Sequence, residues 1–109
     1  MARPRNLPID IAVGVSKEVE IIFSDKPDLR AAEVNMYIKR HAGDSNFILC
    51  KPMDLEKSDL ENGKAYFTFV PDDTKNLPSR TYIYEVKVIY GEGIYVPLIG
   101  DWNLFDTIA

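Results

Sequence analysis

The longest segment of this chain with a strand-like alternation runs from residue 81 to residue 90. The apolar or aromatic positions recur at every second residue: Tyr82, Tyr84, Val86, Val88 and Tyr90. Glu85 and Lys87 occupy the opposite face. A period of two is that of a half-buried β-strand, because successive side chains of a strand point to opposite faces. This segment therefore predicts a sheet with one face against a core.

Six further segments carry a similar signal and are predicted as strands. They cover residues 9–13, 17–23, 32–39, 46–50, 64–70 and 94–99. Pro52 and Pro71 follow two of them, where a ladder that needs N–H donors should stop. Gly91 and Gly93 tolerate positive φ and predict a hairpin between the last two strands. Pro97 predicts that the last strand is an edge, or that its missing donor faces an unpaired side.

The segments between the strands are short and polar. Residues 54–63 end in Asn-Gly, a turn signal, and have room for one helical turn. Residues 72–78 predict a capped helical turn that crosses from one sheet to the other. No amphipathic stretch is long enough to cover a parallel sheet. The expected fold is all-β: one antiparallel β-sandwich of about seven strands over residues 1–109, with an extended arm at 1–8 and a tail at 101–109.

Composition narrows the classes of function. The net charge of -4 argues against a nucleic-acid binder, which needs clustered Lys and Arg. Cys50 is the only cysteine, so no internal disulfide is expected and a reducing compartment is the simpler interpretation. The basic N-terminus lacks the apolar run of a signal peptide, and no segment approaches the roughly 18–20 apolar residues of a membrane span. We expect a cytosolic product, or one that leaves the cell by a route other than secretion.

Residues 77–86 resemble the tyrosine-corner region of fibronectin type III and immunoglobulin-like domains. Tyr82 is at the matching position, where a tyrosine near the start of a strand bonds back to the preceding crossover. Such a corner needs a buried ring whose hydroxyl still finds a backbone acceptor. Leu77 is one residue closer to Tyr82 than in the fibronectin pattern, and the disulfide with its core tryptophan is absent. The corner thus supports an immunoglobulin-like architecture and not membership of either family.

A second resemblance to a known family rests on five segments of the chain, which are residues 9–11, 28–39, 63–69, 73–86 and 98–100. On these segments the sequence resembles the small immunoglobulin-like domains of tailed bacteriophages, as in the baseplate upper-protein N-terminal type. The resemblance implies a structural role in a virion, as a tail, baseplate, neck or capsid-decoration protein made in the host cytoplasm. It also implies many copies in a symmetric assembly, with other virion proteins as partners.

Few residues suggest catalysis. His41 lies at a predicted turn and Cys50 on a predicted strand. A Cys–His couple is formally possible, but no strained nucleophile turn surrounds either residue, and zinc normally takes several such ligands. We interpret both residues as structural and expect a protein that is not an enzyme and uses no cofactor.

Carboxylates gather in two loops and raise the question of calcium. They are Asp54, Glu56, Asp59 and Glu61 in the first loop and Asp72 and Asp73 in the second. Calcium prefers oxygen ligands gathered on one loop, but neither loop has the spacing of an EF-hand. A solvated polar loop or a helix cap is the preferred interpretation of both.

Partner contacts are expected at the two ends of the chain. The candidates are Arg3, Arg5, Leu7, Trp102, Leu104 and Phe105. Near the C-terminus, Trp102 with Leu104 or Phe105 either completes the last strand against the core or forms a contact tail. Tyr37, Ile22 and Ile83 fall on outward faces by the alternation, and exposed apolar residues mark places where neighbours dock.

Two functions therefore fit the sequence. The first is a non-enzymatic structural component of a tailed-phage virion that acts through protein–protein contacts, without binding nucleic acid or membrane. The alternative is an immunoglobulin-like binding or adhesion module that recognises a peptide or a carbohydrate through loops at one end.

Overall fold

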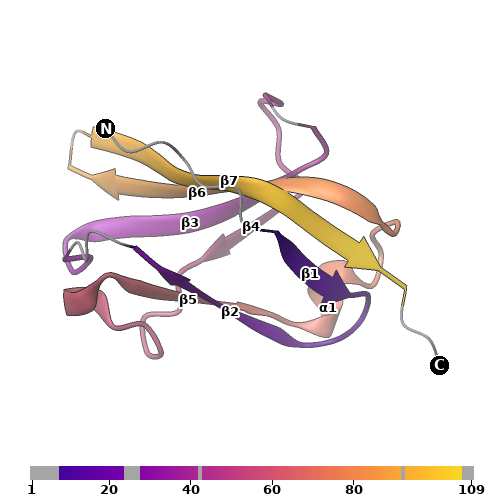
Figure 1. Ribbon diagram of the computed structural model, residues 1–109, viewed down its shortest axis with the longest axis horizontal. Helices are drawn as coiled ribbons and strands as arrows, with labels where there is room; N and C mark the ends of the chain where they lie inside the picture. The colour runs from indigo at the N-terminus through magenta and orange to yellow at the C-terminus, as the bar shows by residue number, and fades with distance from the viewer. Residues whose placement is uncertain (1–7, 24–27, 42, 92, 107–109) are drawn as a thin grey trace.

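The computed structural model describes residues 8–23, 28–41, 43–91 and 93–106. Within these ranges the chain forms seven strands, one turn of 3-10 helix and one of α-helix (Figure 1). The strands are β1 (Ile9–Ala12), β2 (Lys17–Ile22), β3 (Ala32–Lys39), β4 (Leu49–Pro52), β5 (Lys64–Phe69), β6 (Arg80–Tyr90) and β7 (Gly93–Phe105). The helical turns are η1 (Leu60–Asn62) and α1 (Pro71–Thr74). Both lie in the two loops for which a helical turn was expected.

The strands form a sandwich of two unequal sheets. One sheet has the order β1-β7-β6-β3-β4 and the other consists of β2 and β5. The two sheets face each other as two layers in Figure 1. The all-β sandwich predicted from the alternation is therefore present.

The prediction of a purely antiparallel sandwich was wrong at one edge. β1 pairs with β7 in parallel, with Ile9 opposite Trp102 and Ile11 opposite Leu104. Alternation gives the buried face of a strand but not the direction of its neighbour. The turn after β1 leads to β2 in the other sheet, so β1 pairs with a strand that lies far away in the sequence.

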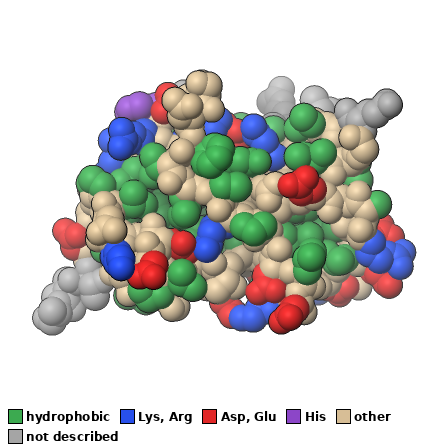
Figure 2. Space-filling view, turned by 180° about the vertical axis from the view of Figure 1, so that it is seen from behind, with side chains coloured by type: hydrophobic (Ala, Val, Ile, Leu, Met, Phe, Trp, Pro, Cys, Tyr) green, Lys and Arg blue, Asp and Glu red, His purple; other side chains and the backbone are tan. Residues whose placement is uncertain are grey.

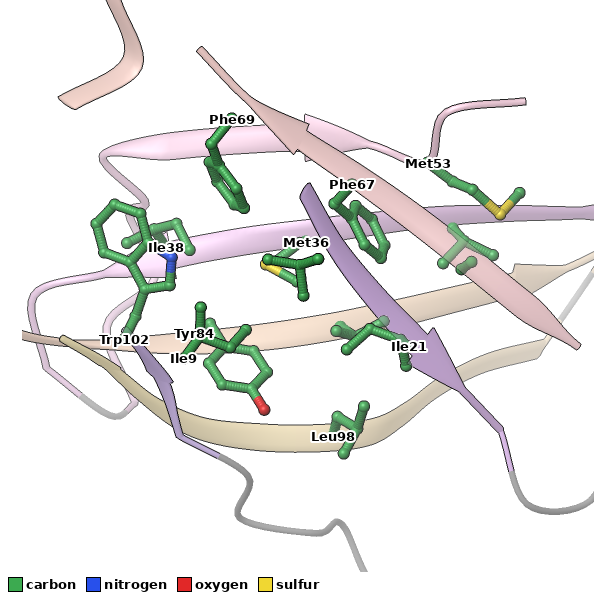
Figure 3. Packing of buried hydrophobic residues seen from close by; sticks show 14 of the residues in the cluster. Ile9, Ile21, Met36, Ile38, Met53, Phe67, Phe69, Tyr84, Leu98 and Trp102 are labelled. Carbon is green, nitrogen blue, oxygen red and sulfur yellow. The ribbon is translucent and has the colours of Figure 1, made fainter. Parts of the chain in front are cut away.

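The core fills the space between the two sheets (Figure 3). Phe67 and Phe69 of β5 are fully buried against the inner face of the larger sheet. From that sheet, Met36, Tyr84 and Trp102 are also fully buried. Each of these residues occupies an inward position of a period-two strand, as a sandwich core requires. Trp102 supplies a large core aromatic from β7, the last strand.

β7 is much longer than predicted, and this corrects the expectation of a tail at 101–109. The strand runs to Phe105 and lies between β6 and β1. Trp102 and Leu104 point inward and are 0% and 3% exposed, so in the folded chain they are core residues and not partner contacts. Phe105 lies on the opposite face and is 50% exposed. Residues 107–109 lie outside the described residues.

Pro97 lies in β7 without ending it, because the strand pairing is irregular there. Val86 is opposite Leu98 and Val88 is opposite Tyr95, so two residues of β7 stand against Lys87 alone. Such a β-bulge tolerates a residue without an N–H donor. β1 pairs with β7 only from Trp102 onward, so the described part of the sheet has no second neighbour at Pro97.

β4 begins later than expected. The prediction covered residues 46–50, whereas the strand runs from Leu49 to Pro52. Phe47 lies before the strand and is 50% exposed, with its ring 5.0 Å from that of Tyr37 in an edge contact. Pro52 is tolerated as the last residue of an edge strand, where a missing donor costs little.

The crossover from β5 to β6 is fixed by three hydrogen bonds. Val70 N–H donates to the Asp73 carboxylate at 2.8 Å, which caps α1. Gly14 N–H donates to Oγ1 of the buried Thr74 at 2.8 Å and so ties α1 to the turn after β1. The Tyr82 hydroxyl donates to the carbonyl oxygen of Pro78 at 2.7 Å. This last bond confirms the corner predicted for Tyr82.

Replacing Tyr82 by phenylalanine tests the corner. The ring is 1% exposed, so removal of its hydroxyl should leave the Pro78 carbonyl without its donor and lower the free energy of unfolding by about 1–1.5 kcal/mol. Urea denaturation measures this loss. Tyr95→Phe is the matched control, because Tyr95 is 48% exposed, and it should leave the midpoint unchanged. Equal midpoints for both variants would mean that the corner bond contributes nothing.

Candidate protein-contact surface

The outer face of the larger sheet is the side of β3, β6 and β7 that points away from β2 and β5. Residues directly opposite each other in a sheet share a face, so the strand register assembles this surface. We use the name outer face for the following residues: Glu33, Asn35, Tyr37, Lys39, Ile83, Glu85, Lys87, Ile89, Ile94, Ile99 and Asp101.

Apolar side chains dominate the part of the outer face formed by β6 and β7. Ile89 lies opposite Ile94, which is 66% exposed. Ile83 and Ile99 are partly buried by their neighbours on the sheet. A sheet face that carries several apolar side chains and has no covering layer in the described chain is typical of a protein-contact site.

Three charged groups of the outer face have partners within the chain: Lys39 and Glu85 form an ion pair, and Lys87 contacts an aromatic ring. Lys39 Nζ lies 3.2 Å from the Glu85 carboxylate, and their side chains are only 10% and 13% exposed. Lys87 Nζ lies over the Tyr37 ring, 5.0 Å from its centroid. Covering an unpaired charge is expensive, whereas a paired charge keeps its partner when water is excluded. A partner could therefore cover this face without stranding either member of the Lys39–Glu85 pair.

The residues that could have suggested catalysis lie beside this surface. Burial raises the pKa of the Cys50 thiol, which lies opposite Tyr37 in the sheet. Burial likewise raises the pKa of the Tyr37 hydroxyl. The thiol therefore stays protonated at neutral pH, and a thiol is a poor nucleophile and metal ligand. The His41 backbone N–H donates to the Asp44 carboxylate at 3.1 Å as part of the β3–β4 loop. This geometry favours the structural interpretation of Cys50 and His41.

The acidic loops use their carboxylates as caps and ion pairs. Asp54 Oδ1 accepts from the backbone N–H two residues further on at 3.0 Å. Glu61 pairs with Arg30 at 3.2 Å, and Asp73 pairs with Lys51 at 2.8 Å. Across the described ranges, no three His, Cys, Asp or Glu side chains come together as a metal site.

One end of the sandwich carries an exposed ion network. Arg30 lies between Asp28, at 2.6 Å, and Glu61. Its hydrogen bonds lower the pKa of Asp28 to about 2, so this carboxylate stays ionised at any physiological pH. The Tyr90 hydroxyl lies 3.4 Å from the Asp28 carbonyl oxygen at the same end.

The opposite end carries an open depression in the β3–β4 loop. Its lining residues are Arg40, Asp44, Ser45, Asn46, Phe47 and Ile48. A half-exposed aromatic ring beside polar groups is the feature in the described chain that would serve a loop-mediated binding module.

The predicted contact residues are dispersed. Arg3, Arg5 and Leu7 lie outside the described residues, and Phe105 is exposed at the end of β7. Tyr37 and Ile83, predicted to face outward, lie together on the outer face. Ile22, also predicted outward, is 57% exposed on the other sheet.

Sequence reasoning missed the isoleucines of β7 and the pairing of Lys39 with Glu85. Ile94 and Ile99 are five positions apart, so alternation alone would place them on opposite faces, and the bulge in the strand register brings both to the outer face, beside Ile89 and Ile83.

No protein-family model and no curated protein matches this sequence. In the part of the chain that the structure describes, no helix has the length and apolar character to cross a membrane.

On the side turned away from the viewer in Figure 1, hydrophobic side chains lie in small groups between basic and acidic ones (Figure 2). Both signs of charge are interspersed on that side, so its surface suits contacts of mixed character.

Proposed function

We propose that this chain is a non-enzymatic structural component of a tailed-bacteriophage virion and acts through protein–protein contacts of the outer face. The observation that carries the proposal is the combination of a group of isoleucines, of which Ile94 is 66% exposed, with the internally paired charges of Lys39 and Glu85. Covering such a face is favourable for its apolar side chains, because they are removed from water. The electrostatic cost is small, because the Lys39–Glu85 pair stays intact. The assignment to a virion rests on the sequence resemblance.

The immunoglobulin-like character of the sandwich is part of the same proposal. Three features support it: the facing sheets, the order β7-β6-β3-β4 in the larger one, and the Tyr82 corner. The parallel pairing of β1 with β7 is compatible with this topology, since β1 lies at the edge of the larger sheet and the turn after it leads to β2 in the other sheet.

Purified particles of the phage that encodes this chain provide the test. Mass spectrometry should find the chain in stoichiometric amounts in the particles. Particles that lack it would remove the virion assignment. In that case, binding of a peptide or a glycan at the depression around Phe47 would support the loop-mediated alternative.

A charge placed on the outer face tests the surface itself. Ile94→Asp should reduce incorporation into particles at least tenfold, because it buries a carboxylate at the contact. Leu55→Asp is the matched control, since Leu55 is 68% exposed in a loop and Ile94 is 66% exposed. Both variants should keep the melting temperature of the parent chain. Equal incorporation of the two variants would exclude the outer face as the contact.

A further inference from the structure

The outward edge of β2 carries free backbone groups. Phe23 N–H donates to the Gly63 carbonyl oxygen at 3.0 Å, so the odd-numbered residues of this strand direct their backbone groups to β5. Glu18, Glu20 and Ile22 must then direct theirs away from β5, because these groups alternate along an antiparallel strand. In the described chain, none of these three residues has a backbone partner on that side.

The other strand of this small sheet is protected on its own outward side. Asp54 N–H donates to the Tyr66 carbonyl oxygen at 2.8 Å, and Tyr66 N–H donates to Ser58 Oγ at 2.9 Å. The outermost strands of the larger sheet are only four residues long, and β4 ends in proline. β2 has six residues, with neither a bulge nor a proline. It is therefore the edge best suited to pair with a further strand.

The side chains along this edge are acidic and exposed. Glu18 and Glu20 are two residues apart and lie on the solvent face of β2. Glu18 pairs with Lys57, and Glu20 accepts from the Tyr66 hydroxyl. These are solvent-exposed contacts, and a carboxylate has lone pairs for further donors. A strand with basic residues two positions apart would match this spacing.

Residues 3–7 of this sequence have that pattern. Arg3 and Arg5 are two residues apart, and the prolines are at positions 4 and 8. If the odd-numbered residues 3, 5 and 7 direct their N–H groups toward β2, the even-numbered Pro4 and Pro8 direct their backbone nitrogens away from it. The N–H groups that the prolines lack are then not needed for pairing with β2. Proline is tolerated in a strand only in that arrangement.

The charge-matched register requires a second copy of the chain. Suppose that Arg5 and Arg3 paired in antiparallel fashion with Glu18 and Glu20 of their own chain. The residues after Arg5 would then run along β2 toward the turn that precedes it, and Ile9 would lie beside that turn. In the structure Ile9 is at the other end of β1, three residues before Ala12, which adjoins the turn. One chain cannot satisfy both placements.

We propose that residues 3–7 of one copy pair as an added strand with the β2 edge of another copy, with Arg3 and Arg5 opposite Glu20 and Glu18. The contact is head-to-tail, and repeated head-to-tail contacts close into rings or continue as filaments. The inference rests on the proposed function, because it names a contact by which many copies of the chain assemble. It uses the β2 edge and leaves the outer face free for other proteins.

Complementary charge reversals in the full chain test the contact. Sedimentation velocity of the parent chain should show concentration-dependent association. Arg3→Glu/Arg5→Glu and Glu18→Arg/Glu20→Arg should each weaken it at least tenfold, through like charges placed opposite each other. A one-to-one mixture of the two variants should associate as the parent chain does, because each arm then meets an edge of opposite charge.

Two further measurements distinguish this contact from association through the outer face. Hydrogen exchange should show protection of the Glu18 and Glu20 amides in the parent oligomer, and the arm variant should lose it. Ile94→Asp should associate like the parent chain. A parent chain that stays monomeric up to its solubility limit, or a variant mixture that fails to associate, overturns the proposal.

The two proposals fail in different ways. A chain that is absent from particles but associates through its arm refutes the virion function and leaves this contact in place. A chain found in particles that is monomeric in solution, with unprotected β2 amides, refutes this contact alone.

Discussion

Replacing Trp102 by alanine is expected to lower the free energy of unfolding by about 3–5 kcal/mol. The indole is fully buried, and its ring centroid lies 5.6 Å from that of Phe69 and 5.8 Å from that of Tyr82. Its removal opens a cavity between the sheets where the three rings meet. Denaturation in urea, extrapolated linearly to water, measures the loss.

Two further variants define what the tryptophan does. Phe105→Ala should change stability by less than about 0.5 kcal/mol, because Phe105 is half exposed. Trp102→Phe should cost clearly less than Trp102→Ala. It keeps an aromatic ring and removes Nε1, a buried donor without a partner in the described chain. Equal costs for Trp102→Ala and Phe105→Ala would return Trp102 to the role of a surface contact.

The contrast between β6 and β7 shows how far sequence reasoning reaches. The prediction for β6 is correct within one residue, because an aromatic or β-branched residue occupies every second position from Tyr82 to Tyr90. The prediction for β7 ends too early, at residue 99. Strands often end near proline or glycine, and this segment contains Pro97 and Gly100. The strand nevertheless continues, through a bulge opposite Lys87. A bulge depends on the partner strand, so the sequence of β7 alone does not reveal it.

The candidate surface was predictable only in part for a similar reason. The outward positions of Tyr37 and Ile83 follow from local alternation. The ion pair joins Lys39 to Glu85, which are 46 residues apart, and it exists only in the register that places β3 beside β6. Local patterns determine which face a residue occupies, and pairing between distant strands determines its neighbours.

Lys39→Met is expected to destabilise the fold by about 2–4 kcal/mol, because it leaves the Glu85 carboxylate unpaired where its side chain is 13% exposed. The double variant Lys39→Met/Glu85→Leu should recover most of this loss, since two apolar side chains of similar length leave no charge to desolvate. The matched control is Lys75→Met. Lys75 and Asp72 are 57% and 80% exposed, and its cost should stay below about 0.5 kcal/mol.

A double-mutant cycle in urea isolates the coupling between Lys39 and Glu85. A large coupling would mean that the pair holds the register of β3 and β6 while leaving no unpaired charge at these two positions of the outer face. The double variant should then be close to the parent chain in stability but less soluble, because it joins the isoleucines into one apolar surface. If Lys39→Met costs no more than Lys75→Met, the pair is effectively solvated. The outer face would then lack the internally satisfied charges on which its proposed role depends.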